Sequence, residues 1–254
     1  MPVQDHAEEF RGPGSGENAA VGVLLSHGFT GSPKSMRPFA EHLAAEGLGV
    51  AVPRLPGHGT TWRELNTTGW QDWYAVLDNE LQRLRKEHDK VFVVGLSMGG
   101  CLVLRLAEQH GADISGVITI NPSVQTDDKR AVLLPVLQRL VPAFPGISND
   151  IKKPGVDEGA YDRMPLRALY SLSQLWKLTR EDLPKVTQPL LLFRSTVDHV
   201  VEPSSGRTVL ARISSRDVTE TLLEDSYHVA TLDNDAPRIF ADSTAFIQRI
   251  SADA

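Results

Sequence analysis

Residues 91–100 of the sequence read Val-Phe-Val-Val-Gly-Leu-Ser-Met-Gly-Gly. An apolar run leads into Ser97, glycines stand two residues before and two residues after this serine, and helical periodicity begins at Met98. A serine on so sharp a turn needs these glycines, because side chains would collide where strand and helix meet. The pattern predicts a nucleophile elbow, with the serine hydroxyl at the carboxyl end of a buried strand. A glycine-rich turn that only caps a helix is the alternative.

Short apolar runs alternate with stretches of helical periodicity along most of the chain. This alternation is typical of βαβ units, and it predicts an α/β fold with a mostly parallel central sheet flanked by helices. Apolar runs predict strands at 20–26, 48–53, 90–95, 116–120, 189–195 and 218–224. Helical periodicity predicts helices at 35–46 (with Ser35 as its cap), 70–88, 98–110, 166–180, 204–213 and 237–250.

Residues 123–164 break this alternation. They form a proline-rich segment of about forty residues where a strand-to-helix loop of ~2–6 residues is usual. Residues 131–147 are almost wholly apolar, and the residues after them are rich in charge. We interpret 123–164 as a cap or lid inserted into one core made of 1–122 and 165–254. The apolar part either contacts lipid or packs on the core.

The composition argues against several functional classes. The 254 residues include 26 Lys+Arg and 32 Asp+Glu, a net charge of −6, without a basic cluster for nucleic acid. Cys101 is the single cysteine, so neither an internal disulfide nor a thiolate metal site is expected. Residues 1–16 lack the apolar core of a signal peptide, and no apolar run is long enough to span a membrane. A cytoplasmic location is therefore expected, and no metal or cofactor is implied.

A nucleophilic serine needs a base, because a free hydroxyl is nearly inert at neutral pH. His228 follows the last predicted strand, where the base belongs in the chain order Ser-Asp-His; a surface-turn histidine is the alternative. The carboxylate that orients the base is expected to be Asp198, at the carboxyl end of the strand 189–195. Asp225, three residues before His228, is its competitor.

Acyl transfer also requires hydrogen-bond donors for the oxyanion. One is the backbone N–H of Met98, directly after the serine. The second is expected in the loop 26–33, which reads Ser-His-Gly-Phe-Thr-Gly-Ser-Pro, and Phe29 supplies its N–H. We expect His27, in the same loop, to fix the loop rather than to act as a base.

With these residues the sequence resembles the α/β-hydrolase superfamily, and within it the bacterial monoacylglycerol lipases and the related carboxylesterases. The resemblance implies an esterase that cleaves monoacylglycerols to glycerol and fatty acid through an acyl-enzyme on Ser97, with no cofactor. It also implies that Glu158 binds the glycerol hydroxyls and that Ile147 lines an acyl tunnel. The matching segments, spread along the chain, are 27–38, 53–60, 95–100, 149–161, 198–201 and 226–233.

Two other functions stay open at this point. A short-chain carboxylesterase of broad specificity would use the same machinery, and a non-catalytic ligand-binding protein could keep the pocket without turnover. For Glu158, a solvated surface charge is the alternative. The expected partner is a small lipid ester, and the cap of such an enzyme would touch a membrane or a lipid aggregate transiently. The sequence leaves the oligomeric state open.

Overall fold

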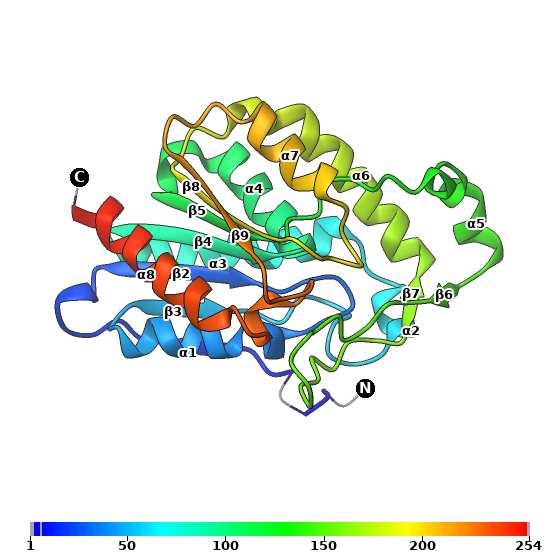
Figure 1. Cartoon of the computed structure of the whole chain (residues 1–254), viewed down its shortest axis with the longest axis horizontal. Coiled ribbons are helices and arrows are strands. Elements are labelled where there is room, and N and C mark those ends of the chain that lie inside the picture. Colours follow the sequence, from blue (N-terminus) through cyan, green and yellow to red (C-terminus); the bar gives the residue numbers. More distant parts are fainter. Residues whose placement is uncertain (1–2, 6, 253–254) are drawn as a thin grey trace.

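The computed structural model describes residues 3–5 and 7–252, and within these residues a seven-stranded sheet forms the centre of the molecule. Figure 1 shows helices packed around this sheet. All neighbouring strands are parallel except the edge strand β1, which runs antiparallel to β3. The strand order is β1 (Phe10–Gly12), β3 (Gly49–Val52), β2 (Val21–Ser26), β4 (Lys90–Leu96), β5 (Gly116–Ile120), β8 (Leu190–Ser195) and β9 (Val218–Leu223).

Two apolar clusters, one on each face of the sheet, form the core. Side chains alternate between the two faces along a strand, so Val91 and Val93 of β4 join one cluster and Phe92 and Val94 the other. The Val91 cluster is built from α3 (Trp70–Glu87), α4 (Met98–His110), α6 (Leu166–Asp182) and α7 (Pro203–Arg212), and the Phe92 cluster from α1 (Arg37–Ala45) and α8 (Ala236–Ala252).

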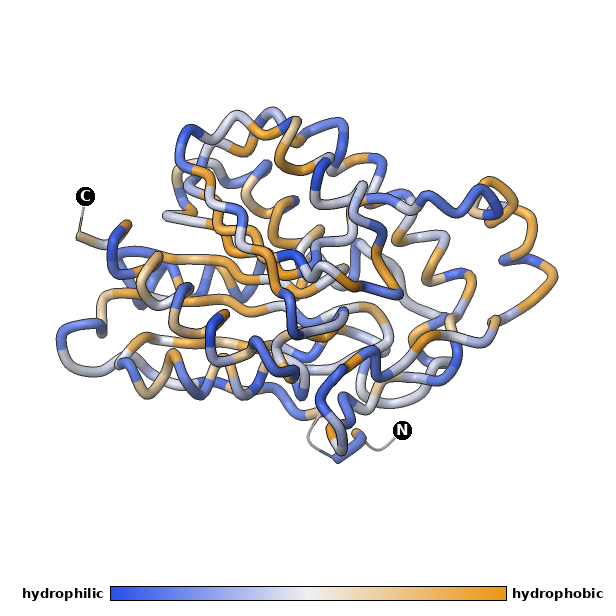
Figure 2. Tube along the Cα trace, viewed as in Figure 1, coloured by the Kyte–Doolittle hydropathy of each residue, from blue (hydrophilic) through white to orange (hydrophobic). Residues whose placement is uncertain are grey.

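The structure confirms the predicted α/β fold. Each of the six predicted strands and six predicted helices is present, with ends within two residues of those expected. In Figure 2 the central strands are the most continuously apolar segments, as expected of a sheet covered on both faces.

Three details differ from the expectation. The edge strand β1 was not predicted, because its three residues, Phe-Arg-Gly, are too few and too polar to show a strand pattern. The short helix α2 (Trp62–Leu65) was not predicted either. Ser35 does not cap α1: it ends a 3-10 turn (Pro33–Ser35), in which the Ser32 side chain accepts a hydrogen bond from the Lys34 N–H.

Residues 123–164 leave the sheet after β5 and return at α6. They contain a 3-10 helix (Lys129–Leu133), α5 (Leu134–Leu140) and most of a two-stranded antiparallel sheet, β6 (Ala143–Pro145) and β7 (Arg163–Pro165). The stretch that carries α5, green in Figure 1, projects from one end of the molecule, and α5 packs against α6. Exposed apolar side chains gather on it: Val132, Leu133, Val136, Leu140, Phe144 and Ile147.

Within residues 3–5 and 7–252, no helix has both the length and the apolar character needed to cross a bilayer.

Candidate active site

Ser97 occupies a strained turn between β4 and α4. Its backbone angles, φ 56° and ψ −118°, lie outside the regions that side chains favour. A Cβ on Gly95 would lie 2.2 Å from the backbone oxygen of Gly99, and a Cβ on Gly99 would lie 2.3 Å from the backbone oxygen of Ser26. Both contacts are with main-chain atoms of buried elements, which cannot move away as a flexible side chain could. Glycine is therefore required on both sides of the serine, as the elbow interpretation expects.

Backbone hydrogen bonds hold Ser97 at the carboxyl end of the sheet. Its N–H donates to Ile120 O (2.9 Å), and its carbonyl accepts from the Ser123 N–H (3.0 Å). The loop after β2 passes beside it, because a Cβ on Gly28 would come within 3.3 Å of the Ser97 Cβ. Within the described part of the chain, the Ser97 hydroxyl forms no hydrogen bond with another residue.

His228 and Asp198 lie together, as predicted from their places in the sequence. His228 Nδ1 is 2.8 Å from Asp198 Oδ2, and both side chains are largely buried. The other oxygen, Asp198 Oδ1, accepts hydrogen bonds from the N–H groups of Val200 and Val201, each at 2.8 Å. A carboxylate only accepts, so the imidazole carries its proton on Nδ1 and leaves the Nε2 lone pair available as a base. Asp225 instead forms an ion pair with Lys152 (2.7 Å).

The electrostatics of the pair favour a charged imidazole. Burial alone would lower the pKa of His228, but the carboxylates of Asp198, Glu158 and Asp150 outweigh burial and raise the pKa above its ordinary value. Burial would likewise raise the pKa of Asp198, yet its bonds to His228 and to two backbone N–H groups hold this pKa below its ordinary value. Asp198 is therefore an anion that stabilises protonated His228.

Sequence reasoning missed Asn121, which holds the loop that carries His228. Its Nδ2 donates to the carbonyl of His228 (2.8 Å), and its Oδ1 accepts from the Ser195 N–H (2.8 Å). Ser195 Oγ in turn donates to the carbonyl of Tyr227 (2.8 Å). Asn121 directly follows β5 and has a positive φ of 45°. A polar residue at the carboxyl end of a buried strand is the sequence signal that could have found it.

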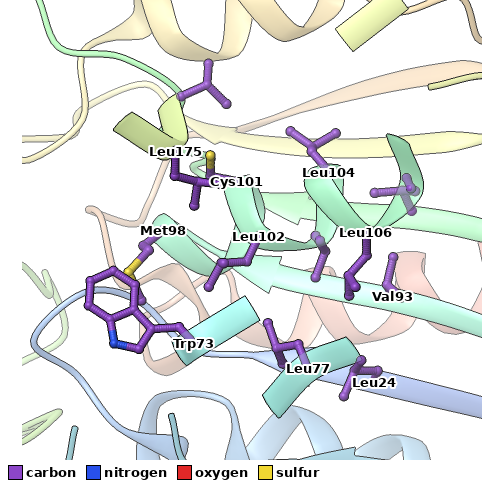
Figure 3. Packing of buried hydrophobic residues seen from close by; sticks show 14 of the residues in the cluster. Leu24, Trp73, Leu77, Val93, Met98, Cys101, Leu102, Leu104, Leu106 and Leu175 are labelled. Atoms are coloured by element: carbon purple, nitrogen blue, oxygen red, sulfur yellow. The ribbon is translucent and has the colours of Figure 1, made fainter. Parts of the chain in front are cut away.

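Phe29 and Met98, the predicted oxyanion donors, anchor in the same apolar cluster. The Phe29 ring packs against Trp73, with ring centroids 5.9 Å apart. Figure 3 shows Met98 directed toward the same indole, and all three residues belong to the cluster on the α3–α4 face. One rigid ring thus supports the two segments whose backbone N–H groups are expected to bind the oxyanion.

His27 ties the loop after β2 to the neighbouring chain. Its ring accepts a hydrogen bond from the Leu55 N–H at Nε2 (3.2 Å), which leaves Nδ1 to donate to Gly28 O (3.0 Å). Burial lowers the pKa of His27 to about 4, so the ring is neutral at physiological pH. With both nitrogens engaged, His27 fixes the loop, as expected.

The structure places Glu158 and Ile147 differently. Glu158 is buried, and a Cβ on Gly31 would lie 3.5 Å from its Oε2, which puts this carboxylate beside the loop of Phe29. Its Oε1 accepts from the Asn149 N–H (3.1 Å), and burial raises the pKa of Glu158. A solvated surface charge is therefore not its state. Ile147, in contrast, is 60% exposed.

Across residues 3–5 and 7–252, the side chains of His, Cys, Asp and Glu do not gather in a group of three that could hold a metal ion.

Comparison with known proteins gives the family. The family model described as serine aminopeptidase, S33, matches residues 17–235, most of the chain. The chain belongs to this family. A thermostable monoacylglycerol lipase of Bacillus sp. (strain H-257) is 41% identical over 248 residues, which cover 98% of this chain and 97% of that protein. A carboxylesterase of Bacillus subtilis (strain 168) is 25% identical and covers 90% of this chain and 92% of its own length.

Solved structures show the same fold. A structure reported for the metagenome-derived lipolytic enzymes LipS and LipT superposes with a TM-score of 0.93 at 40% identity, covering 98% of this chain and all of that one. The monoacylglycerol lipase of Paleococcus ferrophilus shares the fold, with a TM-score of 0.78 at 21% identity and full coverage of both chains. The predicted resemblance to α/β-hydrolases, with monoacylglycerol lipases and carboxylesterases among the relatives, is confirmed.

Proposed function

We propose that this chain is a serine esterase that hydrolyses monoacylglycerols to glycerol and fatty acid through an acyl-enzyme on Ser97. The observation that carries the proposal is the 2.8 Å contact between His228 Nδ1 and Asp198 Oδ2, at the same end of the sheet as the strained serine. Its substrate class rests on the 41% identity to a named monoacylglycerol lipase along nearly the whole chain.

The first half of the reaction forms the acyl-enzyme. His228 Nε2 takes the proton of the Ser97 hydroxyl while Oγ attacks the ester carbonyl. The N–H groups of Phe29 and Met98 donate to the resulting oxyanion, and the amino end of α4 adds its dipole. As the tetrahedral intermediate collapses, the bond to the glycerol oxygen breaks and His228 returns the proton to that oxygen.

The second half repeats these steps with water as the nucleophile. His228 removes a proton from water, whose oxygen attacks the acyl carbon. The bond to Ser97 Oγ then breaks, Oγ regains a proton from His228, and the fatty acid leaves. Asp198 stabilises the imidazolium in both halves, because it lies buried against Nδ1 and remains ionised.

We infer that Glu158 receives the glycerol end of the substrate. Its carboxylate is buried beside the oxyanion loop and near His228. Oε1 accepts from the Asn149 N–H, and among the described residues no backbone donor is bonded to Oε2. Oε2 is thus an acceptor suited to a substrate hydroxyl in a buried site.

We infer further that residues 123–164 act as a cap over one core formed by 1–122 and 165–254. The support is the exposed apolar set on and around α5, apolar in Figure 2, which a protein surface rarely carries without a partner. Transient contact of this face with a lipid aggregate or a membrane would let an acyl chain enter from it. Ile147, exposed at the end of that set, would meet the acyl chain at the entrance.

The test compares ester classes on the purified protein. We expect rapid release of fatty acid from medium- and long-chain monoacylglycerols, much slower turnover of di- and triacylglycerols and of ethyl butyrate, and complete loss in Ser97→Ala. A strong preference for ethyl butyrate would favour the broad-specificity carboxylesterase. Binding of monoacylglycerol without turnover would favour a ligand-binding protein, and faster cleavage of an aminoacyl anilide would favour a peptidase.

A further inference from the structure

Asp150 lies in the 123–164 segment, yet its hydrogen bonds reach both loops that carry the acid and the base. Its side chain is 9% exposed. One oxygen, Oδ2, accepts from the backbone N–H of His199 (3.1 Å) and from the backbone N–H of His228 (3.2 Å). The other oxygen, Oδ1, accepts from His199 Nδ1 (2.7 Å). The carbonyl of Asp150 also accepts from the Val229 N–H (3.1 Å).

A single oxygen atom therefore bridges the two loops, which Asn121 and Ser195 also join at the end of β8. His199 is the residue after Asp198, and the turn it begins supplies the two N–H groups that orient the Asp198 carboxylate. The His228 N–H belongs to the base itself. Both N–H groups are main-chain donors, and Asp150 Oδ2 is the acceptor for both. Moving this oxygen would move the acid and the base relative to each other.

The same region is held independently at a second point. Asp233 is buried, and its carboxylate accepts from the backbone N–H groups of Lys152, Lys153 and Tyr227. The segment around Asp150 is thus held to the His228 loop at two points, through the Asp150 carboxylate and through the Asp233 carboxylate. Asp150 differs from Asp233 because it also reaches the Asp198 loop.

We propose that Asp150 is a positioning residue that holds the Asp198 loop and the His228 loop at the spacing needed for the 2.8 Å contact between their side chains. This inference rests on the proposed function, in which those two residues activate Ser97. It assigns to the 123–164 segment a role in assembling the catalytic residues in addition to covering the substrate.

Two substitutions separate the position of the carboxylate from its charge. Asp150→Asn keeps an oxygen at the Oδ2 place, and a neutral His199 ring with its proton on Nε2 can accept from the new amide N–H at Nδ1. Asp150→Glu keeps the charge but moves the acceptor by one methylene. A displacement of about 1 Å in a catalytic group can cost about 100-fold in rate. If the position of the acceptor matters, Asp150→Glu should lose more catalytic rate than Asp150→Asn, although only Asp150→Asn removes the negative charge.

The experiment measures kcat and KM on a monoacylglycerol and the rate constant for phosphonylation of Ser97 by an alkyl fluorophosphonate. We expect Asp150→Glu to lower kcat and the phosphonylation rate constant by about 30-fold or more with KM within about threefold. Asp150→Asn should keep both rates within about threefold. It should also move the acidic inflection of the rate profile to lower pH, because a negative charge near His228 is lost. Asp162→Asn and Asp162→Glu are the matched controls, since Asp162 is an exposed aspartate of the same segment.

Three outcomes would overturn the inference. The first is a phosphonylation rate constant for Asp150→Glu equal to that for Asp162→Glu. The second is an equal loss of rate in Asp150→Asn and Asp150→Glu, and the third is an effect of Asp150→Glu on thermal stability or KM alone. Phosphonylation follows individual folded molecules and needs no lipid substrate. A wild-type protein that reacts with the phosphonate but spares monoacylglycerols would therefore contradict the proposed substrate and leave the Asp150 comparison valid.

Discussion

Gly99, in the first turn of α4, lies so close to the end of β2 that a Cβ on it would be 2.3 Å from the backbone oxygen of Ser26. This contact joins the helix that follows Ser97 to the strand that precedes the oxyanion loop. The distance between the two segments is therefore set by backbone atoms, and the glycine cannot be replaced without moving one of them.

We expect Gly99→Ala to destabilise the protein by about 3 kcal/mol or more, at the upper end for overpacking in a core, and to lower activity at least 100-fold. Urea denaturation and ester turnover measure these effects. Gly206→Ala, in α7, is the control, because its Cβ would meet the flexible end of Arg194 rather than backbone. Equal stability of the two variants would contradict the backbone contact.

Asp198→Asn should lower kcat by about 10⁴-fold with little change in folding. The Asn oxygen would accept from the Val200 and Val201 N–H groups, so its amide N–H would face His228 Nδ1 and force the proton to Nε2. The base would then lack its lone pair toward Ser97. Steady-state kinetics measure the loss.

Asp225→Asn is the matched control for this change. Because Asp225 pairs with Lys152 at the surface, we expect its activity within about twofold of wild type. A loss in Asp225→Asn as large as that in Asp198→Asn would mean that the acid has been misassigned.

Activity should fall in mild acid, because His228 acts only when neutral. Its raised pKa places the inflection of kcat/KM above pH 6.5, the ordinary imidazole value, with full activity on the alkaline side. Glu158→Gln should move this inflection to lower pH, since the Glu158 charge is one that raises the pKa of His228. An unchanged inflection in that variant would contradict the placement of Glu158 beside the base.

The neutral, buried His27 predicts a loss of stability in acid. Its pKa is about 4 in the folded protein and near 6.5 when unfolded. Between these values only the unfolded chain takes up the proton, so stability is full above pH 6.5 and falls as the pH drops toward 4. The loss attributable to His27 is about 3 kcal/mol.

His27→Asn tests this, because a side chain that does not titrate cannot contribute to that loss. We expect the free energy of unfolding to fall less steeply between pH 7 and pH 4 in the variant than in wild type, as measured by urea titrations. Parallel curves for the two proteins would show that His27 is protonated equally in both states.

The exposed apolar face of the 123–164 segment should bind lipid aggregates. The double variant Val136→Ser/Leu140→Ser should weaken binding to neutral phospholipid vesicles by about tenfold or more. Burial of each apolar side chain in the lipid contributes about 1 kcal/mol or more to the binding free energy. Its kcat on a dissolved short-chain ester should stay unchanged. Val218→Ser/Leu222→Ser, exposed on β9, is the control, and equal binding of both variants would contradict the assignment.

Local patterns in the sequence were enough to predict the parallel sheet and the elbow. Residues 91–100 alone predict the elbow, because the burial of a strand and the glycines of a tight turn are short-range requirements. The order of Ser97, Asp198 and His228 along the chain, each after a strand, was informative because parallel strands end at one edge of the sheet. The edge strand β1 carried no such pattern and was found only in the folded chain.

Tertiary structure alone decided which groups touch. The sequence favoured Asp198 over Asp225 by its place after a separate strand, and the contacts of the folded chain decide between them, because Asp225 pairs with Lys152 and Asp198 with His228. Asn121 and Asp150 hold the His228 loop from positions 107 and 78 residues away. Hydrogen bonds of this kind depend on where the strand ends and the 123–164 segment meet in space. A periodic pattern along the chain does not specify which distant residues come into contact.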